Sequence, residues 1–216
     1  MATPTADPKQ FYADYGARHP DDRSKLFEAV SASIDADRVL YPGSYIDIAP
    51  SFHYDDVTYV DTDRRAARFF AQHDAVQELI EAHRNVDGNP RPFRLSFHHM
   101  DYADRLPIED ESVGLLISLY AGFISEHCSR YLAVGGHLLV NPSHGDAAMA
   151  SIDPCLRLVA VVDQRNDSFH LSTDRLDEYL IPRRGTPPTS DELRQLGRGI
   201  AYTRSAAVYL FQKTRR

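Results

Sequence analysis

Residues suited to binding a nucleotide-like ligand stand at the ends of two predicted β-strands. Gly43 follows the strand predicted over residues 37–41, and Asp61 closes the one predicted over 57–60, 18 positions after the glycine. A glycine lets the backbone turn tightly or approach a ligand. A carboxylate about 20 residues further on is placed to accept hydrogen bonds from a ribose diol. The spacing favours a nucleotide site over its two alternatives, a simple turn glycine and an aspartate that only caps the next helix.

The other polar residues at predicted strand ends point to binding rather than to a metal or a nucleophile. His98 and His99 are adjacent, so on a strand their side chains point to opposite faces and are poorly placed to share one ion. Cys128 follows His127 but has no orienting acid at a recognisable spacing, and Ser118 has no nucleophile-elbow glycines around it. We therefore predict no metal site and no catalytic cysteine or serine.

The elements that must position these residues alternate between two hydrophobic periods. Short apolar runs predict strands at 37–41, 57–60, 93–97, 113–120, 137–141, 156–162, 168–171 and 206–211. Helical periodicity predicts an N-terminal helical region and helices at 64–71, 73–83 and 122–132, with two short ones near 173–180 and 190–196. Thr62 or Asp63 is suited to cap the helix that starts at Arg64. This alternation is typical of an α/β fold with a parallel sheet.

Composition narrows the class of protein. The 216 residues are 43% hydrophobic and 25% charged, with a net charge of −7, which favours a globular core over disorder. The acidic balance makes a nucleic-acid partner unexpected, although residues 183–216 hold eight Lys or Arg against two acids. Neither a membrane span nor a signal peptide is predicted, so we expect a cytoplasmic protein. Cys128 and Cys155 are expected to be free thiols.

Four segments, in order, resemble the class I, Rossmann-like S-adenosylmethionine-dependent methyltransferases. Residues 38–45 stand at the place of the family's glycine-rich first motif, and 57–61 at its acidic ribose-binding strand end. The segment 97–113 looks like the one that holds adenine, and 131–140 is similar to the Leu-Gly-Gly turn into the fifth strand. The resemblance implies a three-layer α/β sandwich. Its sheet would be a mostly parallel, seven-stranded type with a C-terminal antiparallel hairpin and room for an extra strand at 168–171.

The resemblance also implies a function and a set of contacts. It predicts one domain over 1–216, with an N-terminal helical segment to residue 37, a cofactor half over 38–141 and substrate-side elements over 142–216. It implies S-adenosylmethionine as cofactor and a small molecule as substrate, and leaves the oligomeric state open. The expected cofactor contacts are Tyr41, Gly43, Ser44, Asp61, Thr62, Asp101, Tyr102 and Tyr120, and the expected substrate contacts are Tyr45, Asn141 and His144.

The chain departs from the family at its first motif, which usually carries two or three glycines but here has only Gly43. Residues 42–56 leave room for a helix of about two turns. The alternative hypothesis is therefore a methyltransferase fold that has lost methyl transfer, with Tyr45, Ile46 and Ile48 filling the methionine site. We expect an open cavity instead. A nicotinamide dehydrogenase is a weaker alternative because its glycine pattern is missing, and the family's Asn-Pro-Pro-Tyr signature for amino methylation of nucleic acids is absent after Ser118.

Overall fold

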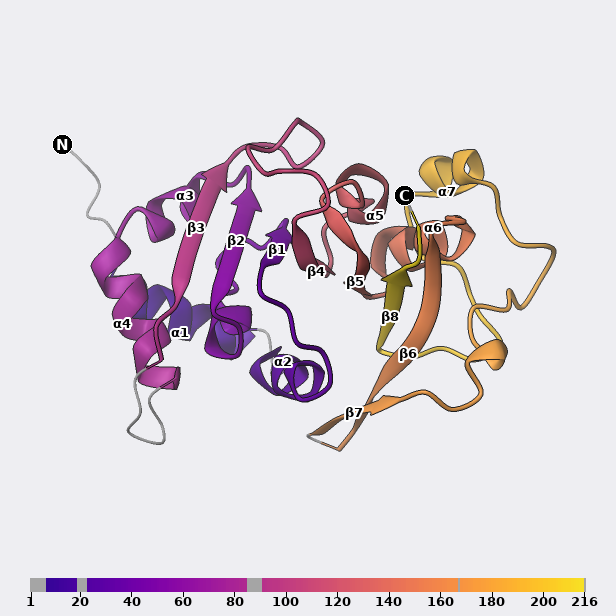
Figure 1. Cartoon of the computed structure of the whole chain (residues 1–216), viewed down its shortest axis with the longest axis horizontal. Coiled ribbons are helices and arrows are strands. Elements are labelled where there is room, and N and C mark those ends of the chain that lie inside the picture. The colour runs from indigo at the N-terminus through magenta and orange to yellow at the C-terminus, as the bar shows by residue number, and fades with distance from the viewer. Residues whose placement is uncertain (1–6, 19–22, 85–90, 167, 216) are drawn as a thin grey trace.

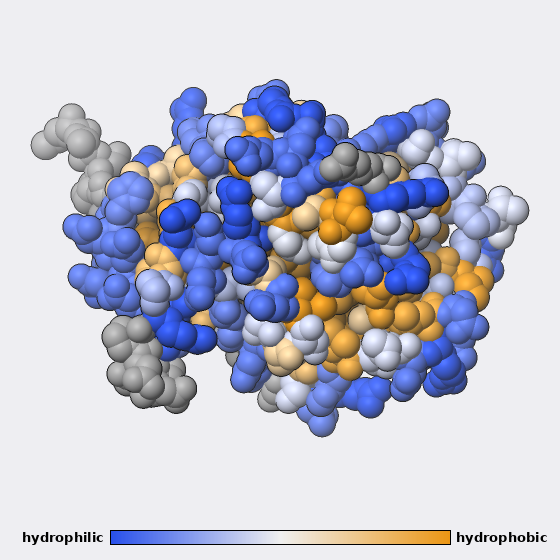
Figure 2. All heavy atoms as spheres, in the orientation of Figure 1, coloured by the Kyte–Doolittle hydropathy of each residue, from blue (hydrophilic) through white to orange (hydrophobic). Residues whose placement is uncertain are grey.

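The computed structural model describes residues 7–18, 23–84, 91–166 and 168–215. Within them, eight strands form one mixed sheet in the order β3-β2-β1-β4-β5-β8-β6-β7 (Figure 1). Hydrophilic side chains dominate the face over β2 and β3, whereas apolar groups surface in the half that contains β8 and β6 (Figure 2). The predicted α/β class with a largely parallel sheet is confirmed.

The parallel half of the sheet brings the ends of the chemistry-bearing strands to one edge. Its strands are β1 (Val39–Pro42), β2 (Asp56–Asp61), β3 (Arg94–His99), β4 (Val113–Ser118) and β5 (Leu132–Val140). Every pairing between neighbours among them is parallel. All four residues of β1 are buried, as a strand covered on both faces requires.

The antiparallel half contains β8 (Val208–Lys213), β6 (Leu156–Arg165) and β7 (Ser168–Ser172). Strand β8 lies between β5 and β6 and pairs antiparallel with both. The expected C-terminal antiparallel strands are thus present. The extra strand at 168–171 is present as well, because β7 pairs with β6 at the sheet edge.

Helices cover the two faces with separate cores. One core takes apolar side chains from α1 (Pro8–Arg18), α2 (Arg23–Ser31), α3 (Arg64–Phe70) and α4 (His73–Arg84). The other face packs against α5 (Ile124–Cys128) and α6 (Asp146–Ile152), with α7 (Ser190–Leu196) against α6. Side chains of β1 alternate between the cores, since Val39 and Tyr41 belong to the first and Leu40 to the second.

Four predicted elements differ from the structure. The connection 42–56 holds one 3-10 turn, η1 (Ala49–Phe52), instead of a two-turn helix. Helix α5 is shorter than the predicted 122–132 because Gly122, at φ +93, lies outside it and Tyr131 turns into the core. The predicted turn at 133–136 belongs to β5, where the pairing with β4 shifts register, and 173–180 holds only the 3-10 turn η3 (Leu176–Glu178).

Candidate functional site

A pocket of about 320 Å³ lies at the carboxyl ends of the parallel strands. Side chains and backbone from the segments after β1, β2, β3 and β4 line it, and these residues are Gly43, Asp61, Thr62, Asp101, Tyr102, Tyr120 and Ala121. Six of the eight residues predicted as cofactor contacts therefore meet at one place. Carboxyl ends of strands in open α/β sheets are where such folds bind ligands.

Asp61 ties the loop after β1 to the end of β2. The Tyr45 N–H donates to its Oδ2 at 2.7 Å, and the Asp63 N–H donates to its Oδ1 at 2.7 Å. Helix α3 is capped by Asp63, which accepts from the Arg65 N–H, so Asp61 is not the helix cap. A carboxylate offers about four acceptor sites, which leaves Asp61 able to accept further hydrogen bonds from a ligand.

Both the close packing and the backbone conformation at position 43 require a glycine. Its φ is +66, and a Cβ added there would lie 2.1 Å from the Cβ of Ala121, in the loop after β4. Its N–H donates to the Val60 carbonyl at 2.7 Å. The loops after β1 and β4 therefore touch at the pocket wall through a residue without a side chain.

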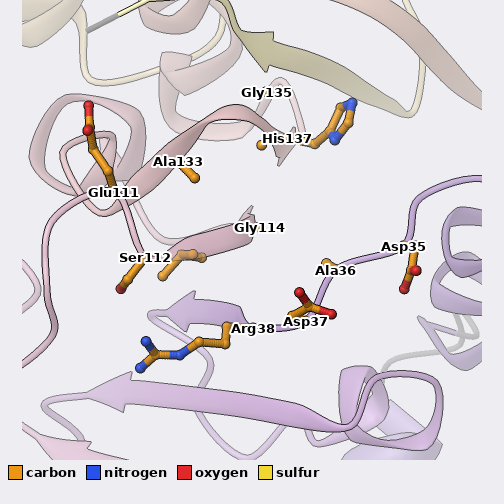
Figure 3. Close-up of a pocket in the computed structure, with 12 residues that line it drawn as sticks. Asp35, Ala36, Asp37, Arg38, Glu111, Ser112, Gly114, Ala133, Gly135 and His137 are labelled. Atoms are coloured by element: carbon orange, nitrogen blue, oxygen red, sulfur yellow. The ribbon is translucent and has the colours of Figure 1, made fainter.

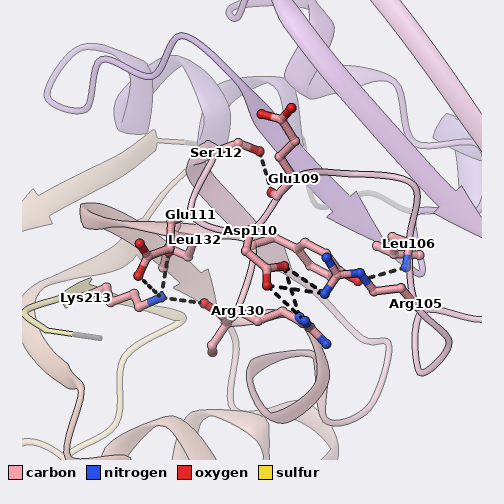
Figure 4. Close-up of polar contacts among 11 residues, drawn as sticks. Arg105, Leu106, Glu109, Asp110, Glu111, Ser112, Arg130, Leu132 and Lys213 are labelled. Carbon is pink, nitrogen blue, oxygen red and sulfur yellow. Dashed lines mark hydrogen bonds and ion pairs between the residues drawn. The ribbon is translucent and has the colours of Figure 1, made fainter.

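A loop that is fastened at several points carries Asp101 and Tyr102 to the pocket, and Figure 4 shows its later part, from Arg105 to Ser112. Asp101 accepts from the Ala103 N–H at 2.9 Å, and the Tyr102 hydroxyl donates to the Ala121 carbonyl at 2.8 Å. Further along, Asp110 pairs with both Arg105 and Arg130. These contacts hold a 13-residue connection between β3 and β4 in which no helix occurs within the described residues.

A buried carboxylate holds the loop after β4 in place through hydrogen bonds. Asp146, at the start of α6 and 1% exposed, accepts from the Ser118 hydroxyl at 2.5 Å and from the Ser125 N–H and hydroxyl. Ser118 ends β4, and Ser125 is the second residue of the next element, α5. The carboxylate thus fixes both ends of the segment that carries Tyr120 and Ala121.

Burial raises the pKa of the Asp146 carboxyl, against the lowering effect of the hydrogen bonds from Ser118 and Ser125. The folded chain holds this proton more tightly than the unfolded chain. The resulting stability is therefore full below the unfolded pKa of about 3.9 and is lost as pH rises through the folded pKa. We expect the free energy of unfolding of the wild type, relative to Asp146→Asn, to fall as the pH rises above about 4.

Urea unfolding of both proteins at several pH values measures this difference. The exposed Asp74→Asn provides the matched control, and its difference from wild type should vary less over the same range. Parallel profiles for the wild type and Asp146→Asn would contradict the assignment of a raised pKa to Asp146.

Strained backbone follows three strands at this edge. Tyr45, Tyr120 and His144 have positive φ values of 50, 62 and 55 and come after β1, β4 and β5. Such conformations cost about 1–3 kcal/mol each and cluster at functional sites. Their position supports the carboxyl edge as the site.

An arginine that was not among the sequence-predicted residues lies next to the pocket. The Arg23 Nη1 donates to the Asp47 Oδ2 at 2.6 Å and to the Tyr41 hydroxyl at 3.1 Å, and its guanidinium lies over the Tyr120 ring at 5.3 Å. Asp47 is 1% exposed. The signal in the sequence that points to this arginine is Asp47, an acid just after the first motif. A buried carboxylate needs a cation as its partner.

The remaining predicted residues lie outside the pocket. Tyr41 and Ser44 are buried behind it. Asn141 is buried too, and its Oδ1 accepts from the Tyr120 N–H at 3.3 Å. His144 lies in the turn η2 (Ser143–Gly145), and Tyr45 lines a neighbouring pocket.

A cavity of about 340 Å³ lies at the opposite, amino ends of β1, β4 and β5 (Figure 3). Its charged side chains do not converge, since Glu111 and Asp35 lie on opposite sides of it. Throughout the described ranges, no group of three or more His, Cys, Asp or Glu side chains is placed to hold a metal ion. Nor is any helix in the part of the chain that the structure describes long and apolar enough to cross a membrane. Because polar side chains converge in the pocket at the carboxyl edge and not in this cavity, we place the candidate site at the carboxyl edge.

No family model and no curated protein matches the sequence. Among solved structures, a protein described as a methyltransferase, in a complex with the Haloferax volcanii Trm112 methyltransferase activator, is 14% identical, with a TM-score of 0.51 over 99% of both chains. A Thermotoga maritima S-adenosylmethionine-dependent methyltransferase is 12% identical, with a TM-score of 0.49 over 95% of this chain and 96% of that one.

A Methanococcus maripaludis protein described as an S-adenosylmethionine-dependent methyltransferase is 16% identical, with a TM-score of 0.43. That alignment covers 65% of this chain and 65% of that one, slightly less than two thirds of its length. Sequence identities this low support a shared fold and say nothing about activity or substrate. The strand order, the antiparallel C-terminal strands and the full-length match to the protein in the Trm112 complex show that the chain has the fold of the class I S-adenosylmethionine-dependent methyltransferases.

Proposed function

We propose that this protein is an S-adenosylmethionine-dependent methyltransferase that acts on a small molecule, with the whole chain 1–216 as one domain. The observation that carries the proposal is the pocket at the carboxyl edge. It gathers Asp61 from the end of β2 and the adjacent Asp101 and Tyr102 from the loop after β3 around one cavity. A volume of about 320 Å³ falls within the usual range for small-molecule pockets.

The residues present fit the nucleoside part of this cofactor. Asp61 retains acceptor sites for a ribose diol, and the Tyr102 ring offers an aromatic wall beside Asp101, whose carboxylate can accept from an adenine amino group. The close approach at Gly43 leaves only backbone on one wall. When bound, S-adenosylmethionine supplies a sulfonium methyl group for transfer.

The protein's own part in such a transfer is mainly positioning. In-line displacement at a sulfonium gains much of its acceleration from holding the nucleophile in place. Tyr120 and the segment that Asp146 fixes lie at the pocket and are suited to that task. No catalytic acid or base is assigned.

The second candidate is a methyltransferase fold without methyl transfer, and one observation favours it. Gly43 is packed against Ala121 where the single glycine of the first motif stands, so the pocket is narrow on that side. Against it, Ile46 and Ile48 are fully buried in the core with α1 to α4 rather than lining the pocket, and Tyr45 lines another cavity. The open cavity therefore supports the first candidate.

Calorimetric titration with S-adenosylmethionine and with its demethylated product tests the proposal. We expect dissociation constants below about 0.1 mM, corresponding to about 5.5 kcal/mol of binding free energy. Incubation with methyl-labelled cofactor and a library of small metabolites then tests transfer, with a nucleic-acid mixture as comparison. Binding without transfer to any acceptor would favour the second candidate. The absence of heat and of thermal stabilisation at millimolar cofactor would reject the first candidate and leave a methyltransferase fold that does not bind the cofactor.

A further inference from the structure

A second pocket, of about 220 Å³, lies beside the first. Helix α1, the loop after β1 and the start of α3 form it, and its lining residues are Phe11, Tyr15, Arg18, Tyr45 and Arg65. We call it the α1 pocket. It is smaller than the pockets that take drug-sized ligands, so its size suits a molecule with one ring.

The walls of the α1 pocket are aromatic and packed in fixed orientations. The Phe11 ring meets the Tyr45 ring edge-on, with centroids 6.2 Å apart and planes at 78°. The Tyr15 ring is tilted against Tyr45 at 5.8 Å. Rings in this arrangement offer both edges and faces to a planar ligand. Aromatic pairs of this kind contribute more interaction free energy than the area they bury would give.

The charge of the α1 pocket is positive. The Arg65 guanidinium lies over the Tyr45 ring at 5.1 Å and uses its Nε and Nη2 on Asp63. Among the residues that the structure describes, Arg18 donates one hydrogen bond, from its Nε to the Asp14 carbonyl at 3.0 Å. The terminal nitrogens of Arg18 and the Nη1 of Arg65 are therefore available, and none of the five lining residues is acidic. A guanidinium fork matches a carboxylate in shape and charge.

Tyr45 connects the α1 pocket to the cofactor pocket. Its side chain lines the first, while its N–H donates to Asp61, which lines the second. Its φ of 50 is one that a tyrosine holds only when its surroundings impose it. Burial raises the pKa of the Tyr45 hydroxyl above its usual range.

We propose that the α1 pocket binds a small aromatic carboxylate, with its ring against the pocket-facing sides of Phe11, Tyr15 and Tyr45 and its carboxylate on Arg18 and Arg65. The site is independent of methyl transfer, because nothing in its chemistry requires the cofactor.

The test is a calorimetric titration of the full chain, without cofactor, using three probes that share a 4-hydroxyphenyl ring and differ in the charge of their substituent. 4-Hydroxybenzoate carries the carboxylate, 4-hydroxybenzamide is neutral and 4-hydroxybenzylamine is cationic. We expect the acid to bind at least about tenfold more tightly than the amide, as expected for one charge-assisted contact, and the amine to bind least. Equal affinity of acid and amide, or no heat from the acid at several millimolar with folded protein, would overturn the proposal.

Variants separate the pocket from general surface charge. Arg18→Gln should weaken binding of 4-hydroxybenzoate by about tenfold, and Tyr45→Gly should abolish it while tolerating the positive φ. Arg68→Gln removes an exposed arginine of the same helix as Arg65 but outside the pocket, and should leave affinity unchanged. An equal loss in Arg68→Gln and Arg18→Gln would overturn the site. Since cofactor is absent throughout, failure here is separate from failure of the proposed methyl transfer.

Discussion

Replacing Asp61 with alanine should weaken binding of S-adenosylmethionine and of its demethylated product by about tenfold or more. Two effects act in the same direction. The carboxylate that would accept from a ribose diol is lost, at about 1.5–3 kcal/mol for a hydrogen bond to a charged group. The Tyr45 and Asp63 N–H groups also lose their acceptor, so the pocket wall loosens. Calorimetric titration of wild type and variant measures the change.

Two further variants separate these effects. Asp61→Asn keeps an acceptor oxygen but removes the charge, and should fall between wild type and Asp61→Ala. Asp56→Asn, at the other end of β2, changes a carboxylate that pairs with Arg94 at 3.5 Å, and should leave cofactor binding intact. Cofactor affinity equal to wild type in a folded Asp61→Ala protein would remove Asp61 from the site and weaken the proposed function.

Replacing Gly43 with alanine should give the largest loss of stability among the pocket residues. The added Cβ would lie 2.1 Å from that of Ala121, on a backbone whose φ is +66. Left-handed strain of about 1–2 kcal/mol adds to overpacking of about 1–3 kcal/mol. For a chain of this size the sum lowers the midpoint of thermal unfolding by roughly 5–15 °C. Thermal unfolding followed by circular dichroism measures it.

The double variant Gly43→Ala with Ala121→Gly is the informative control. It removes the clash between the two loops but keeps the strained φ, so it should recover about half of the loss. Ala121→Gly by itself should cost less than about 1 kcal/mol, as expected for a glycine introduced in a loop. A Gly43→Ala protein as stable as wild type would show that the two loops do not touch as described.

The order of the strands along the chain follows from local pattern. Apolar, β-branched runs bounded by turn residues specify strands such as β2 and β4 through the periodicity of their side chains. Asp61 and Asp101 were identifiable as site candidates for the same reason, because carboxyl ends of parallel strands meet at one edge. Their meeting with Gly43 and Tyr120 around one pocket agrees with that expectation.

Long-range contacts decided the rest. Ser118 and Ser125 are joined through the buried Asp146, which lies 28 and 21 residues further along the chain. Arg23 reaches Asp47, Tyr41 and Tyr120 only because α2 packs across the loop after β1. Local periodicity contains no information about such partners, since a buried charge selects its partner by three-dimensional proximity. The amino-acid sequence by itself determined the α/β class and the edge at which the candidate residues gather, because both follow from local periodicity and strand direction. The tertiary structure decided which side chains line the pocket there and placed the Tyr45 side chain in a second pocket.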